Sequence, residues 1–477
     1  MFQKRSNSVP KQRRPLANDR RRGGIAVLSA VMMVILLAMA AFAIDLGFVA
    51  TVRTELQRSA DAGALAGAGA LPYGPEAAAD AARQYVSANS VGGVSVNPED
   101  IEIELGTWDP VTYTYVPGSE LPTAVRVRVD RNNGGLFFGP VLGESSYNAA
   151  AESVATFQPR DIMLVLDYSA SMNDDSELKK ISQLGRTAVE DNLWDIYNEL
   201  GAPSCGNMPW KPTLLTTLTG SVNSILQILG LDTEPYPYPS GSWSDFVNYV
   251  KNDGTVNAAG YRDKYCILVW VNYLLQNKPR AAETPDLWMT SEQPLTAVKD
   301  SVSLFINYIQ QVDTDDQMGL SVYTSASGGA VLETGLTSDF PLVETITRQR
   351  QAGHYDLYTN IGAGMQTARI ELEQNARPGA LKLMVLMTDG IANRPSDTTT
   401  ARAFALSEAD LAAAAKIPII TISLGSGADV NLMQQIADVT GGRHFNIPGG
   451  QTVAEYEADL KDVFRAIADD RPLKLVR

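Results

Sequence analysis

An apolar run of 21 residues extends from Gly24 to Ile44, with no charged residue and with Ser29 as its one polar side chain. As an α-helix this run is about 31 Å long, at ~1.5 Å per residue, and it matches a bilayer hydrocarbon core of about 30 Å. The helical pattern continues beyond Ile44 until Pro72 ends it. We therefore expect a transmembrane helix at 24–44 and a juxtamembrane helix at 45–71.

Near the end of this helix, Gly63 and Gly67 are four positions apart, a spacing that lets another helix approach closely. The pattern of apolar and polar residues changes after the helix. Residues 72–158 then contain runs with period-two alternation, which predict strands with one wet face, and turn residues separate them. We expect a small α+β spacer, with a helix at 75–89 and strands at 101–105, 111–116, 124–129 and 147–157.

From residue 160 onwards, short apolar runs alternate with helical stretches. Ile162–Leu166 and Leu381–Met387 have the uninterrupted apolar character of buried parallel strands. The alternation predicts a doubly wound α/β domain over 160–477. Its further helices are expected at 295–310, 361–375, 432–439 and 454–468, and its further strands at 318–324, 417–424 and 443–447.

The charge of the chain is unevenly distributed. Residues 1–22 contain eight Lys and Arg and one Asp, a balance of +7, and since the whole chain carries −15, the remainder carries −15 − 7 = −22. An acidic body of this kind repels nucleic acid. The basic tail, 1–23, precedes the apolar run, and the positive-inside rule keeps such a tail in the cytoplasm and sends the body outwards. We expect a single-pass bacterial inner-membrane protein; the alternative is a cleaved signal peptide, whose apolar core is usually shorter than this run.

Oxygen-bearing side chains follow both buried strands. Asp167, Ser169 and Ser171 form a D-x-S-x-S loop after the first strand, and Asp389 follows the second. Thr359 lies just before the helix expected to run to residue 375. In open α/β sheets, ligands collect at the carboxyl ends of the strands, and carboxylate and hydroxyl oxygens without a soft ligand suit Mg²⁺ or Mn²⁺. The sequence thus predicts a divalent-metal site made by these five residues.

Two parts of the chain resemble known families. The segment 21–71, from the basic pair before the apolar run to the small-residue stretch, resembles the N-terminal module of TadE/TadG-like proteins of the Flp (tight adherence) pilus assembly system. The D-x-S-x-S loop, Thr359 and the T-D-G motif at Asp389 resemble the metal-ion-dependent adhesion site of von Willebrand factor A (VWA) domains. This resemblance implies hydroxyl ligands from the serines and the threonine. It also implies that the two aspartates bind the metal directly or through water, with one position left for an acidic side chain of a protein partner.

The 120 residues from 173 to 292 separate the D-x-S-x-S loop from the next expected helix, where the resemblance implies only a few. We interpret this insertion either as a lid or specificity subdomain beside the metal, or as a decorative domain with its aromatic residues in its own core. Cys205 and Cys266 are the only cysteines, which excludes a zinc cluster of thiolates. In an extracytoplasmic domain we expect them to form one disulfide, with two separate thiols as the alternative.

No part of the chain has the pattern of a catalytic centre. HExxH, G-x-S-x-G and P-loop motifs are absent, and His354 and His444 are the only histidines. We therefore expect a non-enzymatic, membrane-anchored VWA protein that acts with pilus assembly components or in surface adhesion. The alternative is a pilin-like structural subunit whose N-terminal helix packs into a filament. Ser29 disfavours it, because processed pilins carry Glu at the corresponding position. A hydrolase within the insertion would need a nucleophile–base pair, which the sequence does not offer.

Overall fold

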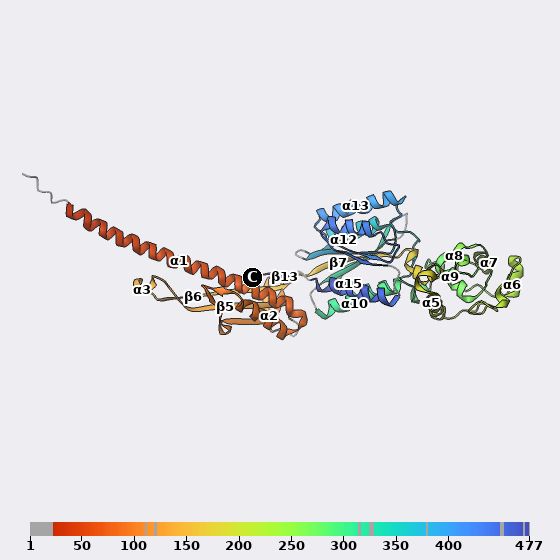
Figure 1. Cartoon of the computed structure of the whole chain (residues 1–477), viewed down its shortest axis with the longest axis horizontal. Coiled ribbons are helices and arrows are strands. Elements are labelled where there is room, and N and C mark those ends of the chain that lie inside the picture. The colour runs from red at the N-terminus through yellow and green to blue at the C-terminus, as the bar shows by residue number, and fades with distance from the viewer. Residues whose placement is uncertain are drawn as a thin grey trace, which may run out of the picture. The chain divides into compact units, whose positions relative to one another are not determined.

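The computed structural model describes residues 22–109, 112–118, 122–312, 316–323, 329–377, 380–448, 453–470 and 473–476. The expected basic tail, 1–23, lies outside the described residues except for its last two. The chain divides into two compact units, one made of Met1–Thr156 with Leu475–Arg477 and the other of Phe157–Lys474. Figure 1 labels some of the helices and strands of each unit.

The first unit begins with one continuous helix, α1, from Arg22 to Ala70. Its segment Ile25–Ala70 is, within the described residues, the one helix long and apolar enough to cross a membrane. The side chains of its apolar half face outwards all round, with Leu36 and Phe42 each 60% exposed. A helix that exposes apolar side chains on every side is suited to lipid as its solvent.

The second half of α1 packs against the rest of its unit. Gly63 and Gly67 lie at the tightest contacts: a Cβ on Gly63 would come within 2.4 Å of Val86 Cγ2 in helix α2 (Pro75–Ser87), and one on Gly67 within 2.9 Å of Val125 Cγ1. The helix that approaches the small-residue face of α1 is therefore α2 of the same chain.

The remainder of the first unit is a five-stranded sheet in the order β13-β6-β5-β3-β4, which confirms the predicted α+β spacer. The edge strand β13 comes from the end of the chain, where the N–H of Val476 donates to the carbonyl of Val154 at 2.9 Å. The domain expected at 160–477 thus ends earlier in the structure, because its last residues complete the spacer sheet. The elements are β1 (Ser90–Val91), β2 (Val94–Ser95), β3 (Ile101–Asp109), β4 (Thr114–Pro117), β5 (Ala124–Gly135), α3 (Gly139–Leu142), β6 (Ser146–Phe157) and β13 (Leu473–Leu475).

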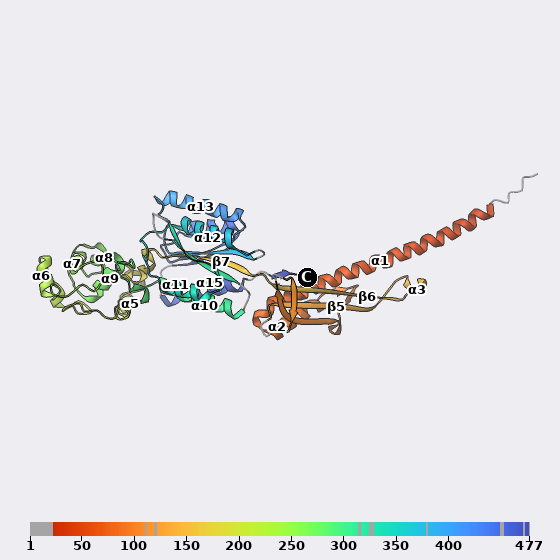
Figure 2. The ribbon, with the colours of Figure 1, turned by 180° about the vertical axis from the view of Figure 1, so that it is seen from behind.

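The second unit contains a six-stranded sheet in the order β12-β11-β10-β7-β8-β9. All neighbouring pairs are parallel except β8 and β9. Helices α10, α11 and α15 cover one face, and α12 and α13 cover the other (Figures 1 and 2). Helix α14 packs into the same core as α12 and α13. This confirms the doubly wound fold, whereas β9, α11 and α13 were not predicted. The bounds are β7 (Arg160–Asp167), α10 (Leu295–Val312), β8 (Gln317–Tyr323), β9 (Ala330–Thr337), α11 (Phe340–Arg348), α12 (Ile361–Asn375), β10 (Leu381–Thr388), α13 (Thr398–Ala414), β11 (Ile419–Leu424), α14 (Val430–Thr440), β12 (His444–Ile447) and α15 (Val453–Asp469).

The insertion between β7 and α10 is helical and has its own hydrophobic core, in which Trp243, Tyr265 and Trp270 are buried. Its entry and exit are joined: the N–H of Asp175 donates to the carbonyl of Gln293 at 3.0 Å, and the N–H of Gln293 donates to Ser176 Oγ at 2.8 Å. Because the two ends of the insertion are adjacent, β7 and α10 can pack as they would without the insertion. Its helices are α4 (Ile181–Leu184), α5 (Arg186–Glu199), α6 (Val222–Ile228), α7 (Trp243–Asn252), α8 (Gly254–Ala258) and α9 (Ile267–Asn277).

The predicted disulfide is absent, since Cys205 and Cys266 are both free and both buried in the core of the insertion. An apolar core accommodates a protonated thiol without a cross-link, because cysteine then behaves as a small hydrophobic residue. Burial raises the pKa of both thiols to about 12.

We predict that both thiols are inert in the native protein. At neutral pH a thiol with a raised pKa is protonated, and the thiolate is the reactive species. Ellman's reagent should therefore detect no thiol in the folded, unreduced chain and two after unfolding in guanidinium. Finding no free thiol after unfolding without reductant would contradict the structure.

A buried ion pair holds the start of the central strand. Arg160, at the first position of β7, donates from its guanidinium to Asp316 Oδ2 at 2.9 and 3.1 Å, and both side chains are 1% exposed. The same guanidinium donates to the carbonyl of Ile467, at the end of α15, at 3.0 Å. This cluster joins β7, the residue before β8 and the last helix of the unit.

We predict that Asp316→Ala lowers the free energy of unfolding of the second unit by about 3–5 kcal/mol, because it leaves a buried guanidinium unpaired. Urea unfolding followed by tryptophan fluorescence measures this, since five of the six tryptophans lie in Phe157–Lys474. The control is Asp462→Ala, which removes an exposed pair with Arg465 and should change stability by less than about 1 kcal/mol. Equal effects of the two changes would contradict the importance of the buried pair.

Candidate metal centre

The two carboxylates of the predicted site lie at the ends of neighbouring strands. Strand β7 ends at Asp167, and Asp389 directly follows β10. These strands pair in parallel, with Val165 opposite Leu386, so that their carboxyl ends meet at one edge of the sheet. Asp167 is 1% exposed and Asp389 is 9% exposed. The parallel register therefore brings two buried negative charges to the same place.

Hydrogen bonds connect these carboxylates to the hydroxyls of the D-x-S-x-S loop. The N–H of Ser169 donates to Asp167 Oδ1 at 2.9 Å, which turns the chain at the end of β7. Ser171 Oγ donates to Asp389 Oδ1 at 2.7 Å, and the Ser169 and Ser171 hydroxyl oxygens are 3.0 Å apart. Four of the five predicted residues thus form one continuous cluster of oxygen atoms.

Thr359 brings a third hydroxyl to this cluster. It lies just before α12, and it is held by Asn393, whose side-chain oxygen accepts the N–H of Thr359 and whose N–H donates to the carbonyl of Thr359, both at 3.0 Å. A Cβ on Gly390 would lie 3.5 Å from Thr359 Oγ1 and 3.6 Å from Ser171 Oγ. Both hydroxyls therefore lie against the residue that follows Asp389, and all five predicted residues are brought together.

The electrostatics of the cluster favour a cation. Burial raises the pKa of Asp389 well above its usual range, and the charge of Asp167 raises it further, while the hydrogen bond from Ser171 opposes the shift. Burial also raises the pKa of Asp167, against hydrogen bonds from Ser169 and from Thr388. Within the described part of the chain, neither aspartate has an ion pair with Lys or Arg. Two buried carboxylates thus lack a compensating positive charge from the protein.

The donor set decides which metal fits. Among the described residues, no three His, Cys, Asp or Glu side chains gather to hold a metal by themselves. The cluster instead offers two carboxylates and three hydroxyls, all of them oxygen donors. Oxygen donors without thiolate or imidazole suit a hard cation such as Mg²⁺ or Mn²⁺. The residues present therefore fit the expected metal, which they would hold at the strand ends.

Three neighbouring residues were missed by the sequence prediction. Thr388 Oγ1 donates to Asp167 Oδ2 at 2.7 Å and so orients the first carboxylate. Its place in the T-D-G motif was the available signal. Asp174 and Asp175, in the turn after Ser171, add negative charge next to Asp389, and both raise its pKa. Asp174 and Asp175 lie next to Asp389 because the chain forms a short 3₁₀ helix at Ala170–Ser176. The sequence pattern does not predict this helix.

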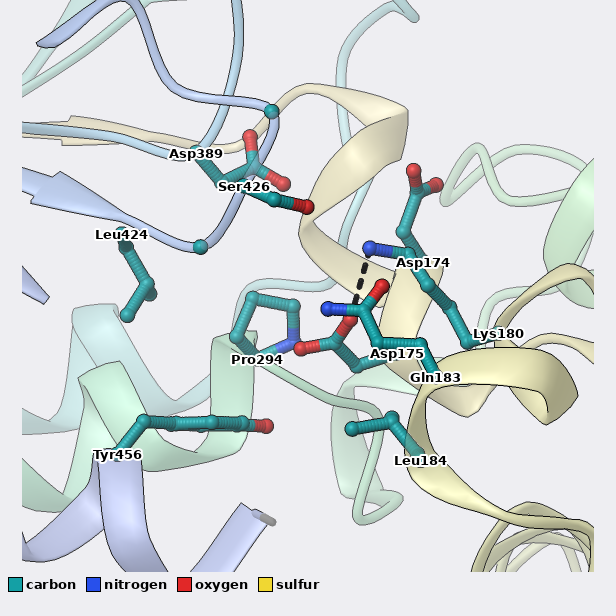
Figure 3. A pocket seen from close by; sticks show the side chains of 12 residues that line it. Asp174, Asp175, Lys180, Gln183, Leu184, Pro294, Asp389, Leu424, Ser426 and Tyr456 are labelled. Carbon is teal, nitrogen blue, oxygen red and sulfur yellow. Dashed lines mark ion pairs between the residues drawn. The ribbon is translucent and has the colours of Figure 1, made fainter. Parts of the chain in front are cut away.

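A pocket beside Asp389 lies between the insertion and the loop after β11 (Figure 3). Asp174 and Asp175 border it on one side, and Lys180 forms an ion pair with Asp175 at 3.2 Å. The pocket therefore connects the candidate metal centre with residues of the insertion. Its lining is Asp174, Asp175, Lys180, Gln183, Leu184, Pro294, Asp389, Leu424, Gly425, Ser426, Gly427 and Tyr456.

The insertion also holds the loop that carries Thr359. Gln351 Nε2 donates to the carbonyls of Pro279 at 2.6 Å and Thr284 at 2.8 Å. Arg280 forms an ion pair with Asp356 at 3.0 Å. On its other side the loop is joined to the D-x-S-x-S segment, because the N–H of Gly353 donates to the carbonyl of Tyr168 at 2.9 Å. Residues 351–359 are therefore fixed between the insertion and the candidate site.

Three protein-family models match parts of the chain. The family described as putative Flp pilus-assembly TadE/G-like matches residues 23–70, and the putative Tad-like Flp pilus-assembly family matches residues 62–155. The von Willebrand factor type A domain family matches residues 288–457. The chain is a Tad-like protein that carries a VWA domain. The VWA match includes Thr359 and Asp389 and begins near the end of the insertion, most of which separates it from the D-x-S-x-S loop.

Similar solved structures include the conserved hypothetical protein BatB from Bacteroides thetaiotaomicron, at 15% identity over 37% of this chain and 90% of that one, with a TM-score of 0.29. The pilus adhesin SpaC from Lactobacillus rhamnosus GG is 13% identical over 77% of this chain and 34% of that one, with a TM-score of 0.33. Likenesses at these TM-scores add nothing to the assignment. No curated protein matches the chain.

Proposed function

We propose that this Tad-like protein binds a protein partner through a divalent metal held at the carboxyl ends of β7 and β10. The observation that carries the proposal is the pair of buried carboxylates, Asp167 and Asp389, surrounded by three hydroxyls and without a cationic side chain. Mg²⁺ or Mn²⁺ would supply the missing positive charge. An acidic side chain of the partner would complete the coordination of the metal.

The residues around the metal have separate parts in this proposal. Ser169, Ser171 and Thr359 would supply neutral oxygens, so that the metal keeps enough positive charge to attract a further carboxylate. Asp167 and Asp389 would together match the two positive charges of the ion, and the neutral hydroxyls would add no further negative charge against the partner's carboxylate. The protein then acts by binding, and no step of catalysis is assigned to it.

The insertion would select the partner. It borders the pocket next to Asp389, and it holds the loop that carries Thr359 through Gln351 and the Arg280–Asp356 ion pair. A partner that reaches the metal would therefore also contact Asp174 and Asp175. Loops of this kind, placed on a rigid sheet, commonly determine binding specificity.

Anchoring by α1 completes the proposal. The apolar half of the helix is exposed and long enough to cross a bilayer. With the basic tail in the cytoplasm of a bacterial cell, the VWA domain would lie outside the inner membrane. There it would meet pilus assembly components or other surface proteins.

We predict that Mg²⁺ or Mn²⁺ stabilises the full-length chain in detergent. A ligand that binds only the native state at a hundredfold excess over Kd adds about 2.7 kcal/mol. Thermal unfolding with EDTA or with millimolar metal measures this gain. Asp389→Asn should abolish the gain, and without metal it should be at least as stable as the wild type, because it removes repulsion between the carboxylates.

The matched control is Asp410→Asn, the same chemical change on the exposed face of α13. It should respond to metal as the wild type does. The metal-site proposal fails if metal does not raise the unfolding temperature of the wild type, or if it raises that of Asp389→Asn as much as that of the control. Only the VWA fold would then remain.

We also predict that the C-terminus is extracytoplasmic. Alkaline phosphatase fused after Arg477 should be active in a bacterial host, since this enzyme requires the periplasm. Green fluorescent protein, which folds in the cytoplasm, should fluoresce at the N-terminus and not at the C-terminus. The reverse pattern would show that the basic tail does not set the orientation.

A further inference from the structure

The turn between β5 and β6 is an exposed apolar segment. Between Arg131 and Glu144 the chain has no charged residue. At its tip Phe137 is 66% exposed, Phe138 is 40% exposed and Val141 is 86% exposed. Large apolar side chains grouped at one tip, without a cover in the described part of the chain, are typical of an interaction site and not of a soluble surface.

The tip is fixed to one position on α1. The carboxylate of Asp45 accepts the N–H of Phe137 at 2.9 Å and the N–H of Phe138 at 3.0 and 3.2 Å. The ring of Phe137 also packs edge-on against Phe48, with the ring centroids 4.8 Å apart. Figure 1 shows this hairpin beside α1, with α3 at its tip. Asp45 itself is only 6% exposed, so the hairpin covers this charge.

Asp45 is also the first residue after the apolar run. The run from Gly24 to Ile44 fills a hydrocarbon core of about 30 Å, so Asp45 lies at the boundary with the headgroups. Next to it on α1, Phe42, Ile44 and Leu46 are each more than half exposed. The apolar tip and the exposed end of the membrane helix therefore lie at the same level.

We propose that the β5–β6 tip is seated in the interfacial region of the bilayer that α1 crosses. The apolar faces of interfacial helices enter this region to a depth of about 5–10 Å, and the apolar side chains of the tip would enter the same region. Residues 132–143 carry no charge to oppose entry. Arg131 lies further down the hairpin, opposite Ala149, and the exposed Glu144, whose N–H donates to the carbonyl of Gly139 at 3.0 Å, would lie on the headgroup side of the tip. The spacer would then hold the membrane at two points, α1 and the hairpin, instead of turning freely on a single helix. This inference rests on the proposed anchoring by α1 and is independent of the metal site.

Depth-dependent fluorescence quenching tests the proposal. Variants of the full chain that each carry one added cysteine are labelled with a nitrobenzoxadiazole probe and reconstituted into phosphatidylcholine–phosphatidylglycerol vesicles that contain shallow or deep doxyl lipids. The test site is Val141→Cys. Tyr73→Cys is the matched control, because Tyr73 is 78% exposed and follows the far end of α1. Leu36→Cys, in the apolar run, tests the anchor, and the wild type treated with the same probe gives the background from the two buried cysteines.

We expect the probe at Val141 to be quenched more by shallow than by deep doxyl lipids, the probe at Tyr73 to be unquenched and the probe at Leu36 to be quenched by deep ones. If Leu36 is quenched and Val141 behaves as Tyr73 does, the hairpin proposal fails and the anchor stands. A blue-shifted but unquenched probe at Val141 shows that protein covers the tip, in these vesicles a second copy of the chain, and also overturns the hairpin proposal. An unquenched probe at Leu36 overturns the anchor and the hairpin together.

Discussion

Two negative charges placed at one edge of a parallel sheet constrain the second unit of this protein. Strands β7 and β10 are buried neighbours, so the register that packs their apolar residues also brings Asp167 and Asp389 together. Uncompensated carboxylates in a low-dielectric position repel each other and shift towards the neutral form. The surrounding hydroxyls reduce this penalty but supply no positive charge. A bound divalent cation would resolve the conflict, and this is why we propose a metal site here.

The insertion follows from the same geometry. It leaves the sheet directly after the D-x-S-x-S loop and returns to α10 through the contact between Asp175 and Gln293. Because its ends are adjacent, a separate helical core is tolerated without disturbing the sheet. Because it leaves at the D-x-S-x-S loop, its first residues border the candidate site and its later residues hold the loop before Thr359. The separate hydrophobic core that one interpretation of the insertion expected is observed. The insertion also contacts the candidate site, and this position supports our proposal that it selects the partner.

The sequence predicted the elements whose signal is strong and local. The continuous apolar helix, the buried parallel strands and the D-x-S-x-S and T-D-G motifs all follow from period and residue type. The edge strand β9 is only half buried, so its apolar contrast is weak. Helix α13 opens with three threonines and buries a face of alanines, which gives little hydrophobic signal. The thiol pairing, the contribution of β13 to the spacer sheet and the position of Asp174 depend on distances between remote segments, which one sequence does not contain.

The central claim is that Asp167 and Asp389 hold a divalent cation. Electron paramagnetic resonance measures it directly, because Mn²⁺ in solution gives a sharp signal that disappears on binding. Titration of the full-length chain in detergent should show one Mn²⁺ bound per chain, displaced by excess Mg²⁺, and none bound by Asp389→Asn. An undiminished signal from free Mn²⁺ in the presence of the wild-type chain, or equal binding by the variant, would contradict the account.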